Sequence, residues 1–144
     1  MPHPNDAELT ELYSASIGLD VEDDEPNTSA PGSAPATEFD VHVEAVAGNV
    51  LGNGGEDYKL TLTCIDDTLA APNAGMSIGP LDQDFSGGSG WKAGGAAGNF
   101  WNEQTFKVTV PNGVRGHVFH YIGTLVGKGN NVVSFIESNR FILL

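Results

Sequence analysis

The sequence predicts an all-β fold, an antiparallel β-sandwich that follows a short amphipathic helix and an acidic linker. Two observations predict the sandwich: segments from residue 39 onward alternate apolar and polar residues, and turn residues separate them. A third observation separates a tail over residues 1–38 from a domain over 39–144, because acids and then Pro, Ser and Ala dominate the stretch before residue 39.

The early strands are the clearest elements. Alternation predicts strands over 39–47, 58–65 and 105–110, and the turn sequences Asn53-Gly54-Gly55 and Pro111-Asn112-Gly113 interrupt the pattern. Weaker strands are expected near 76–81 and 100–101. Strands at this spacing make the predicted sandwich immunoglobulin-like in rhythm. The paired cysteines and core tryptophan pattern of antibody domains are absent, so the resemblance to immunoglobulin domains is one of architecture alone.

The late strands are apolar on both faces. In the segment 116–126, Val118, Ile122 and Val126 share one face, and Phe119, Tyr121 and Leu125 share the other. Segments 132–136 and 141–144 continue this apolar character after the turn 127–131. Because one sandwich core covers only one face of a sheet, we expect a second layer to cover the remaining face of this C-terminal hairpin.

The N-terminal segment has a helical period. Leu9, Leu12, Tyr13 and Ile17 fall on one helical stripe, which predicts an amphipathic helix over residues 5–17 that Gly18 ends. Such a short helix persists in water only when its apolar stripe packs on another surface. Residues 20–38 then read as a flexible linker, since neither the acid run 20–25 nor the Pro-rich stretch can bury enough apolar area to order itself.

Charge and composition limit the classes of partner. The chain of 144 residues has a net charge of −13, and nine of its 19 acids lie in residues 1–38, which contain no Lys or Arg. This charge argues against nucleic acid or an anionic membrane as a partner, because both require a basic surface. No signal-peptide pattern and no long apolar run is present, so we expect cytoplasmic synthesis without membrane insertion, the final destination being open.

These patterns favour a non-catalytic binding or assembly module. We expect its C-terminal hairpin face to be buried against the N-terminal helix or against another subunit, which makes self-association or a protein partner the leading hypothesis. A second hypothesis is a cargo-type protein whose N-terminal segment is a recruitment signal. The interaction residues would be the apolar ones of the two segments, namely Leu9, Leu12, Tyr13, Ile17, Phe119, Tyr121 and Leu125.

The glycine-rich loop 72–101 supports a different alternative. A carbohydrate- or calcium-binding, lectin-like domain would use aromatic faces and acids of this loop, with Asp82, Asp84, Phe85, Trp91 and Trp101 as the ligand-binding candidates. The purely structural interpretation is that Trp101 belongs to the core and that Trp91 packs the loop against the sandwich. The glycines do not match a phosphate-binding loop, because the Lys and Ser/Thr of that motif are missing.

Metal and catalytic motifs are weaker still. Asp66, Asp67, Asp82 and Asp84 are the calcium candidates, since loops at one end of a sandwich can supply several oxygens, although their spacing is not that of an EF-hand. His117 and His120 differ by three positions and should point to opposite faces of a strand, which argues against a shared zinc site. Cys64, the single cysteine, continues an inward alternation. Because the sequence places no nucleophile–base pair, we expect that the protein is not an enzyme and binds no cofactor.

Overall fold

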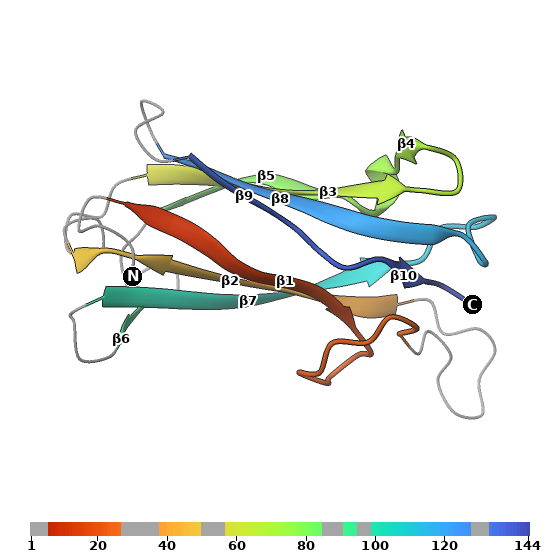
Figure 1. Cartoon of the computed structure of the whole chain (residues 1–144), viewed down its shortest axis with the longest axis horizontal. Coiled ribbons are helices and arrows are strands. Elements are labelled where there is room, and N and C mark those ends of the chain that lie inside the picture. The colour runs from red at the N-terminus through yellow and green to blue at the C-terminus, as the bar shows by residue number, and fades with distance from the viewer. Residues whose placement is uncertain (1–5, 27–37, 50–56, 85–90, 95–98, 128–132) are drawn as a thin grey trace.

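The structure is a computed structural model of the chain, and it describes residues 6–26, 38–49, 57–84, 91–94, 99–127 and 133–144. Almost all regular structure in these ranges is β, and every strand pair is antiparallel. The described strands form two sheets, which Figure 1 shows as stacked layers. The prediction of an antiparallel all-β domain is therefore confirmed.

The first sheet has four strands in the order β1-β2-β7-β6. These strands are β1 (Ala7–Ala15), β2 (Glu38–Ala47), β7 (Asn99–Thr109) and β6 (Lys92–Gly94). The predicted strands over 39–47 and 105–110 lie in β2 and β7, and β7 also contains the weaker segment expected at 100–101.

The second sheet has six strands in the order β10-β8-β3-β4, with β5 also paired to β3 and β9 to β8. Its strands are β3 (Asp57–Asp66), β4 (Ala71–Pro72), β5 (Ile78–Asp84), β8 (Val118–Gly127), β9 (Val133–Glu137) and β10 (Phe141–Ile142). A short 3₁₀ helix, η1 (Ala74–Met76), lies between β4 and β5.

The prediction of an N-terminal helix over residues 5–17 is wrong, because residues 7–15 form the strand β1. The register of β1 on β2 shifts between Leu9 and Glu11, which marks a bulge. The extra residue separates two buried positions, Leu9 and Leu12, by three instead of two. That spacing reproduces the first step of a helical stripe, and the local sequence alone cannot distinguish the two.

One hydrophobic core lies between the sheets, and β1 contributes to it. Ala7, Leu9 and Leu12 belong to the same buried cluster as residues of β2, β3 and β8. Gly123 of β8 makes this contact possible, because a Cβ there would lie 3.2 Å from Leu12 Cδ2 and 3.3 Å from Leu62 Cδ2. The inner face of the C-terminal hairpin is thus covered by a strand of the opposite sheet.

Residues 16–26 also have defined positions, although residues 20–38 were expected to be a flexible linker. Asp23 N–H donates to Ser14 C=O at 2.9 Å, and Ile142 N–H donates to Asp24 C=O at 2.8 Å. The segment therefore connects the end of β1 to β10, and its last described residue, Pro26, is buried. The part of the expected linker at 27–37 lies outside the described residues.

Buried Asp40 of β2 holds the start of this segment. Its Oδ2 accepts a hydrogen bond from Gly18 N–H at 2.8 Å, and its side chain is almost fully buried. Beside it, His42 Nε2 donates to Leu19 C=O at 3.0 Å, and His42 Nδ1 forms a 3.0 Å hydrogen bond with Thr105 Oγ1. Both ring nitrogens of His42 therefore have a partner, one of them in the segment that follows β1.

Candidate interaction surface

The outer face of the C-terminal hairpin contains the large hydrophobic side chains that are exposed within strands of the described residues, Val133 and Phe135. β8 alternates between half-buried and buried positions along its length, so its even-numbered residues point outward. The register pairs Val126 with Val133 and Thr124 with Phe135 across β8 and β9. Paired residues share a face, so these side chains lie together on the outside of the sheet.

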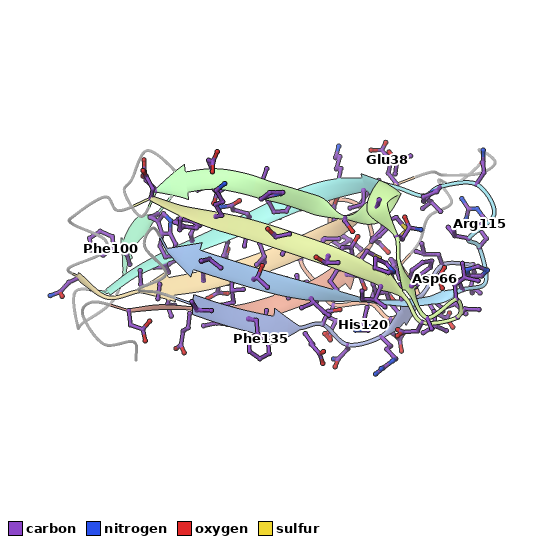
Figure 2. All side chains as sticks on the ribbon, turned by 90° about the horizontal axis from the view of Figure 1, so that it is seen from above. Glu38, Asp66, Phe100, Arg115, His120 and Phe135 are labelled. Carbon is purple, nitrogen blue, oxygen red and sulfur yellow. The ribbon has the colours of Figure 1, made fainter. Side chains whose placement is uncertain are left out.

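Two residues of β9 dominate this surface. Val133 is 65% exposed and Phe135 is 73% exposed, and Figure 2 shows Phe135 at the margin of the sheet. Ile122 and Val126 of β8 are half-buried beside them. We call these four residues, Ile122, Val126, Val133 and Phe135, the outer hairpin face. Charged groups border it, because Lys59 pairs with Val126 and Glu137 pairs with Ile122 in the ladders.

The interaction residues predicted in the C-terminal hairpin lie on its inner side. Phe119 and Tyr121 have no exposed surface, and Leu125 is 1% exposed, so all three belong to the core of the chain itself. The sequence assigned them correctly to one common face. It did not indicate which of the two apolar faces the fold covers, and it therefore missed Val133 and Phe135. Val133 and Phe135 share one face of their strand, but Ile136 on the opposite face is apolar as well, so no local pattern distinguished the covered face from the exposed one.

The N-terminal interaction residues are distributed over different surroundings. Leu9 and Leu12 are buried against the hairpin as parts of β1. Tyr13 points to the other side of its sheet and stacks on His42, with ring centroids 4.9 Å apart. Ile17 follows the strand and is 42% exposed. The four residues do not form one stripe, because the side chains of a strand alternate between its two faces, whereas the predicted helix would have placed all four on one side.

The two tryptophans of the glycine-rich loop have different surroundings. Trp91 is 4% exposed, its Nε1 donates to Tyr58 Oη at 3.2 Å, and the two rings meet edge to face. Trp101 lies within β7 opposite Val46 and is half-buried. It points to the outer side of its sheet, because its neighbour Asn102 is buried, so its interpretation as a core residue is wrong. The Trp91 indole therefore offers no open ring face for a sugar to stack on. Phe85 lies outside the described residues.

The calcium candidates are separated. Asp82 is exposed and lies 3.6 Å from Lys59 Nζ, and Asp84 lies opposite Asp57 in the β3–β5 ladder. Asp66 and Asp67 lie at the far end of β3 and bind histidines. Within the described ranges, no group of three or more His, Cys, Asp or Glu side chains is arranged to hold a metal ion.

The histidine–aspartate contacts join β3 to β8. His117 Nδ1 donates to Asp66 Oδ2 at 2.7 Å, and His120 Nδ1 donates to Asp67 Oδ2 at 2.8 Å. Figure 2 shows Asp66 and His120 at this end of the sheet. The Arg140 guanidinium also approaches Asp67, with Nε 3.5 Å from Oδ2. These bonds were invisible in the sequence, where the two histidines and two aspartates are about 50 residues apart.

Asp66 is the buried member of this group, at 2% exposure. Burial raises its pKa, but the hydrogen bond from His117, the backbone N–H groups of Leu69 and Thr68, and the charge of His117 outweigh burial, so the pKa is lowered from its usual 3.8. A lowered folded-state pKa means that the ionised carboxylate stabilises the fold above the unfolded pKa of about 3.9. The stabilisation is lost as the pH falls from there through the folded pKa.

The change Asp66→Asn should therefore lower the free energy of unfolding by about 2 kcal/mol at neutral pH, the cost of losing a charged acceptor in a buried site. The difference from the wild type should shrink as the pH falls below about 4, where Asp66 becomes protonated. Urea denaturation at a series of pH values measures both. Asp82→Asn is the matched control, because that exposed carboxylate contributes less than about 0.5 kcal/mol. A difference for Asp66→Asn that does not change with pH would contradict the assignment.

Cys64 is structural by its surroundings. It lies in β3 with no exposed surface. Burial raises the pKa of its thiol to about 12, against a smaller lowering by the hydrogen bond with Tyr121. Because the thiolate is the reactive form, a thiol with this pKa is a poor nucleophile near neutral pH.

These features define an antiparallel all-β protein with a buried core and an apolar strip on one outer face that no described segment covers. Comparison with protein-family models and with curated protein sequences gave no significant match. Among the described residues, no helix has the length and apolar character needed to cross a bilayer.

Proposed function

We propose that this chain is a non-catalytic assembly module, a β-sandwich of immunoglobulin-like strand order that associates with a second copy of itself through the outer hairpin face. The strand order supports the fold assignment. Immunoglobulin constant domains place strands A, B, E and D in one sheet and C, F and G in the other. Strands β1, β2, β7 and β6 take the places of A, B, E and D, while β3, β8 and β9 take those of C, F and G.

The single observation that carries the function is the exposure of Phe135 and Val133 beside the half-buried valine and isoleucine of β8. A β8 strand that is apolar on both sides has one side in its own core and no described segment over the other. Burying a phenylalanine contributes about 1.5–3 kcal/mol, so aromatic side chains are frequent anchors of interfaces. A contact centred on Phe135 would bury this strip.

The net charge sets the conditions for association. Each chain carries −13, so two copies repel one another at low ionic strength. We expect self-association to strengthen with added salt, which screens the repulsion and leaves the apolar contact intact. An interface that depended on ion pairs would show the opposite salt dependence.

Sedimentation velocity across a wide range of protein concentrations tests this proposal. The wild-type chain should sediment as a reversible dimer or larger species at high concentration, and Phe135→Ser should weaken that association by at least about tenfold, the equivalent of about 1.4 kcal/mol. Leu69→Ser is the matched control, because Leu69 is 64% exposed but lies in a turn outside the face. A wild-type chain that remains monomeric at the highest concentration and salt would disprove the proposal.

The lectin-like alternative needs ring faces and ligand oxygens that converge. Within the described residues, Trp91 is buried and the candidate aspartates are separated, so that half-buried Trp101 has none of them as a converging partner in a metal-type cluster. The recruitment alternative rests on residues 1–38, of which β1 belongs to the core. No specific observation favours either alternative over assembly.

A further inference from the structure

A seam runs between β1 and β9, the neighbouring edges of the two sheets. The strands lie close to one another, but they belong to different sheets and share no ladder in the described residues. A hydrogen bond from Leu9 N–H to Ser134 Oγ, 3.0 Å long, links them. Beyond this bond, toward the C-terminal ends of both strands, the seam opens.

Two adjoining hollows occupy the open part of the seam. The first, of about 510 Å³, is lined by β1 residues including Leu12 and Tyr13, by Ile136 of β9, and by the segment that contains Val21. The second, of about 490 Å³, continues past Tyr13 and Glu22 toward Arg140. Tyr13, Glu22 and Asn139 line both hollows, so together they form one groove along the seam.

The backbone of β1 faces this groove. Leu9 N–H and Ser14 C=O both point away from β2, since the first donates to Ser134 and the second accepts from Asp23. Leu12 and Ser14 are two positions apart in the strand after the bulge, so their backbone groups point to the same side. The N–H and C=O of Leu12 therefore point to the groove as well. No ladder partner meets them in the described parts of the chain. Unpaired groups of this kind are what an extended peptide pairs with when it binds along a strand edge.

The side chains around the groove determine the charge of the occupant. The first hollow has four acids, and the second adds two more. Arg140 is the one cation among the lining residues, and its guanidinium already approaches Asp67. Apolar side chains lie between the acids. The acids of the groove are Glu11, Asp20, Glu22, Asp23, Asp24 and Glu137.

We propose that this seam is a binding groove for an extended basic peptide, a segment of another protein in which Lys or Arg alternates with apolar residues. The peptide backbone pairs with the free edge of β1 at Leu12. Its apolar side chains pack on Leu12, Val21 and Ile136, and its basic side chains meet Glu22 and Glu137. The groove is lined by none of the four residues of the outer hairpin face, although Glu137 borders both surfaces, and the assembly proposal does not depend on this one.

Glu22 is in a favourable position for this role. Asn139 Nδ2 donates to its Oε1 at 2.9 Å, which fixes the carboxylate at the point where the hollows meet. The second oxygen is 3.4 Å from the same nitrogen. The carboxylate keeps open lone pairs toward the groove for a Lys or Arg of the peptide.

Fluorescence anisotropy with the full chain and a short labelled peptide of alternating Lys and Val tests the proposal. The variant Glu22→Gln/Glu137→Gln should bind about five- to tenfold more weakly, the expected loss of two exposed charge pairs. The control Glu8→Gln/Glu38→Gln removes the same net charge from residues that do not line the groove, and should change Kd less than about twofold. Equal weakening in both variants would show general attraction to an acidic chain and overturn the proposal, as would no binding to the wild type.

A second peptide tests the extended pairing. The same peptide with methyl groups on alternate backbone nitrogens keeps its charges but loses donors for a strand edge. We expect its binding to be at least several-fold weaker than that of the unmodified peptide for one of the two methylation registers. Unchanged binding for both registers would overturn the assignment of an extended peptide to the edge of β1. Urea denaturation of each variant confirms that the substitutions leave the fold intact.

Discussion

Replacing Phe141 by alanine should lower the free energy of unfolding by about 3–5 kcal/mol. Phe141 is 2% exposed, although it lies three residues before Leu144 and in a strand of only two residues. Its ring centroid is 5.5 Å from that of Phe39 and 5.8 Å from those of Phe119 and Tyr121. Truncation removes these contacts and leaves a cavity that the surrounding sheets cannot close, because both are fixed by their ladders.

The matched control is Phe135→Ala, which removes the same atoms from a side chain that is 73% exposed. In the monomer this change should cost less than about 0.5 kcal/mol, as surface substitutions do. Chemical denaturation of the two variants at low protein concentration measures the contrast. Similar losses for Phe135→Ala and Phe141→Ala would contradict the division of the hairpin into a core side and an outer side.

Phe141→Ala should have a second, local effect. Ile142 N–H donates a hydrogen bond to Asp24 C=O, so β10 also fixes the position of the segment that follows β1. We expect faster hydrogen exchange at Asp23 and Ile142 in this variant than in Phe135→Ala, because loosening β10 exposes both amide groups to water.

The change Gly79→Ala should lower the free energy of unfolding by about 3 kcal/mol or more, the sum of an unfavourable backbone conformation and overpacking. Gly79 has φ = +89°. A Cβ at this position would lie 2.5 Å from Leu60 C=O and 3.0 Å from Leu81 N. Both neighbours are backbone atoms, so the clash is relieved only by moving β5 away from β3, which breaks the pairing of Leu60 with Leu81.

Gly113→Ala separates the two contributions. Gly113 has φ = +81° but no atom within 4 Å of an added Cβ, so this variant should lose only the conformational part, about 1–2 kcal/mol. Thermal or chemical denaturation of both variants gives the comparison. If Gly79→Ala costs no more than Gly113→Ala, the close approach of β3 and β5 at Gly79 is not as described.

These predictions locate the stability of the chain in the layer between the sheets and leave the outer surfaces for recognition. The inner residues of β8 are committed to the core, so substitution there would unfold the protein before it informed on any partner. Phe135, Glu22 and Glu137 are exposed at their surfaces, and their variants test recognition with little effect on stability.

The period-two alternation of β2 and β3 was sufficient to predict these strands and their inward residues. Phe39, Val41, Leu60, Leu62 and Cys64 are all buried, as the pattern indicated. Local sequence determines such strands because successive side chains point to opposite faces of the sheet. When the core covers only one of these faces, apolar residues recur at every second position. The weaker segments at 76–81 and 100–101 also lie partly or wholly in strands, β5 and β7.

The sequence by itself thus determined an antiparallel all-β protein, most of its strands, and the presence of two apolar faces on the C-terminal hairpin. Only the tertiary structure decided that residues 7–15 are a strand, because a bulge against β2 gave Leu9 and Leu12 a helical spacing. The tertiary structure also decided which hairpin face is covered, since that depends on Leu12 packing at Gly123 from the opposite sheet. The seam between β1 and β9 is likewise decided by the tertiary structure. It joins residues more than a hundred positions apart, and no local pattern records which sheet edges meet.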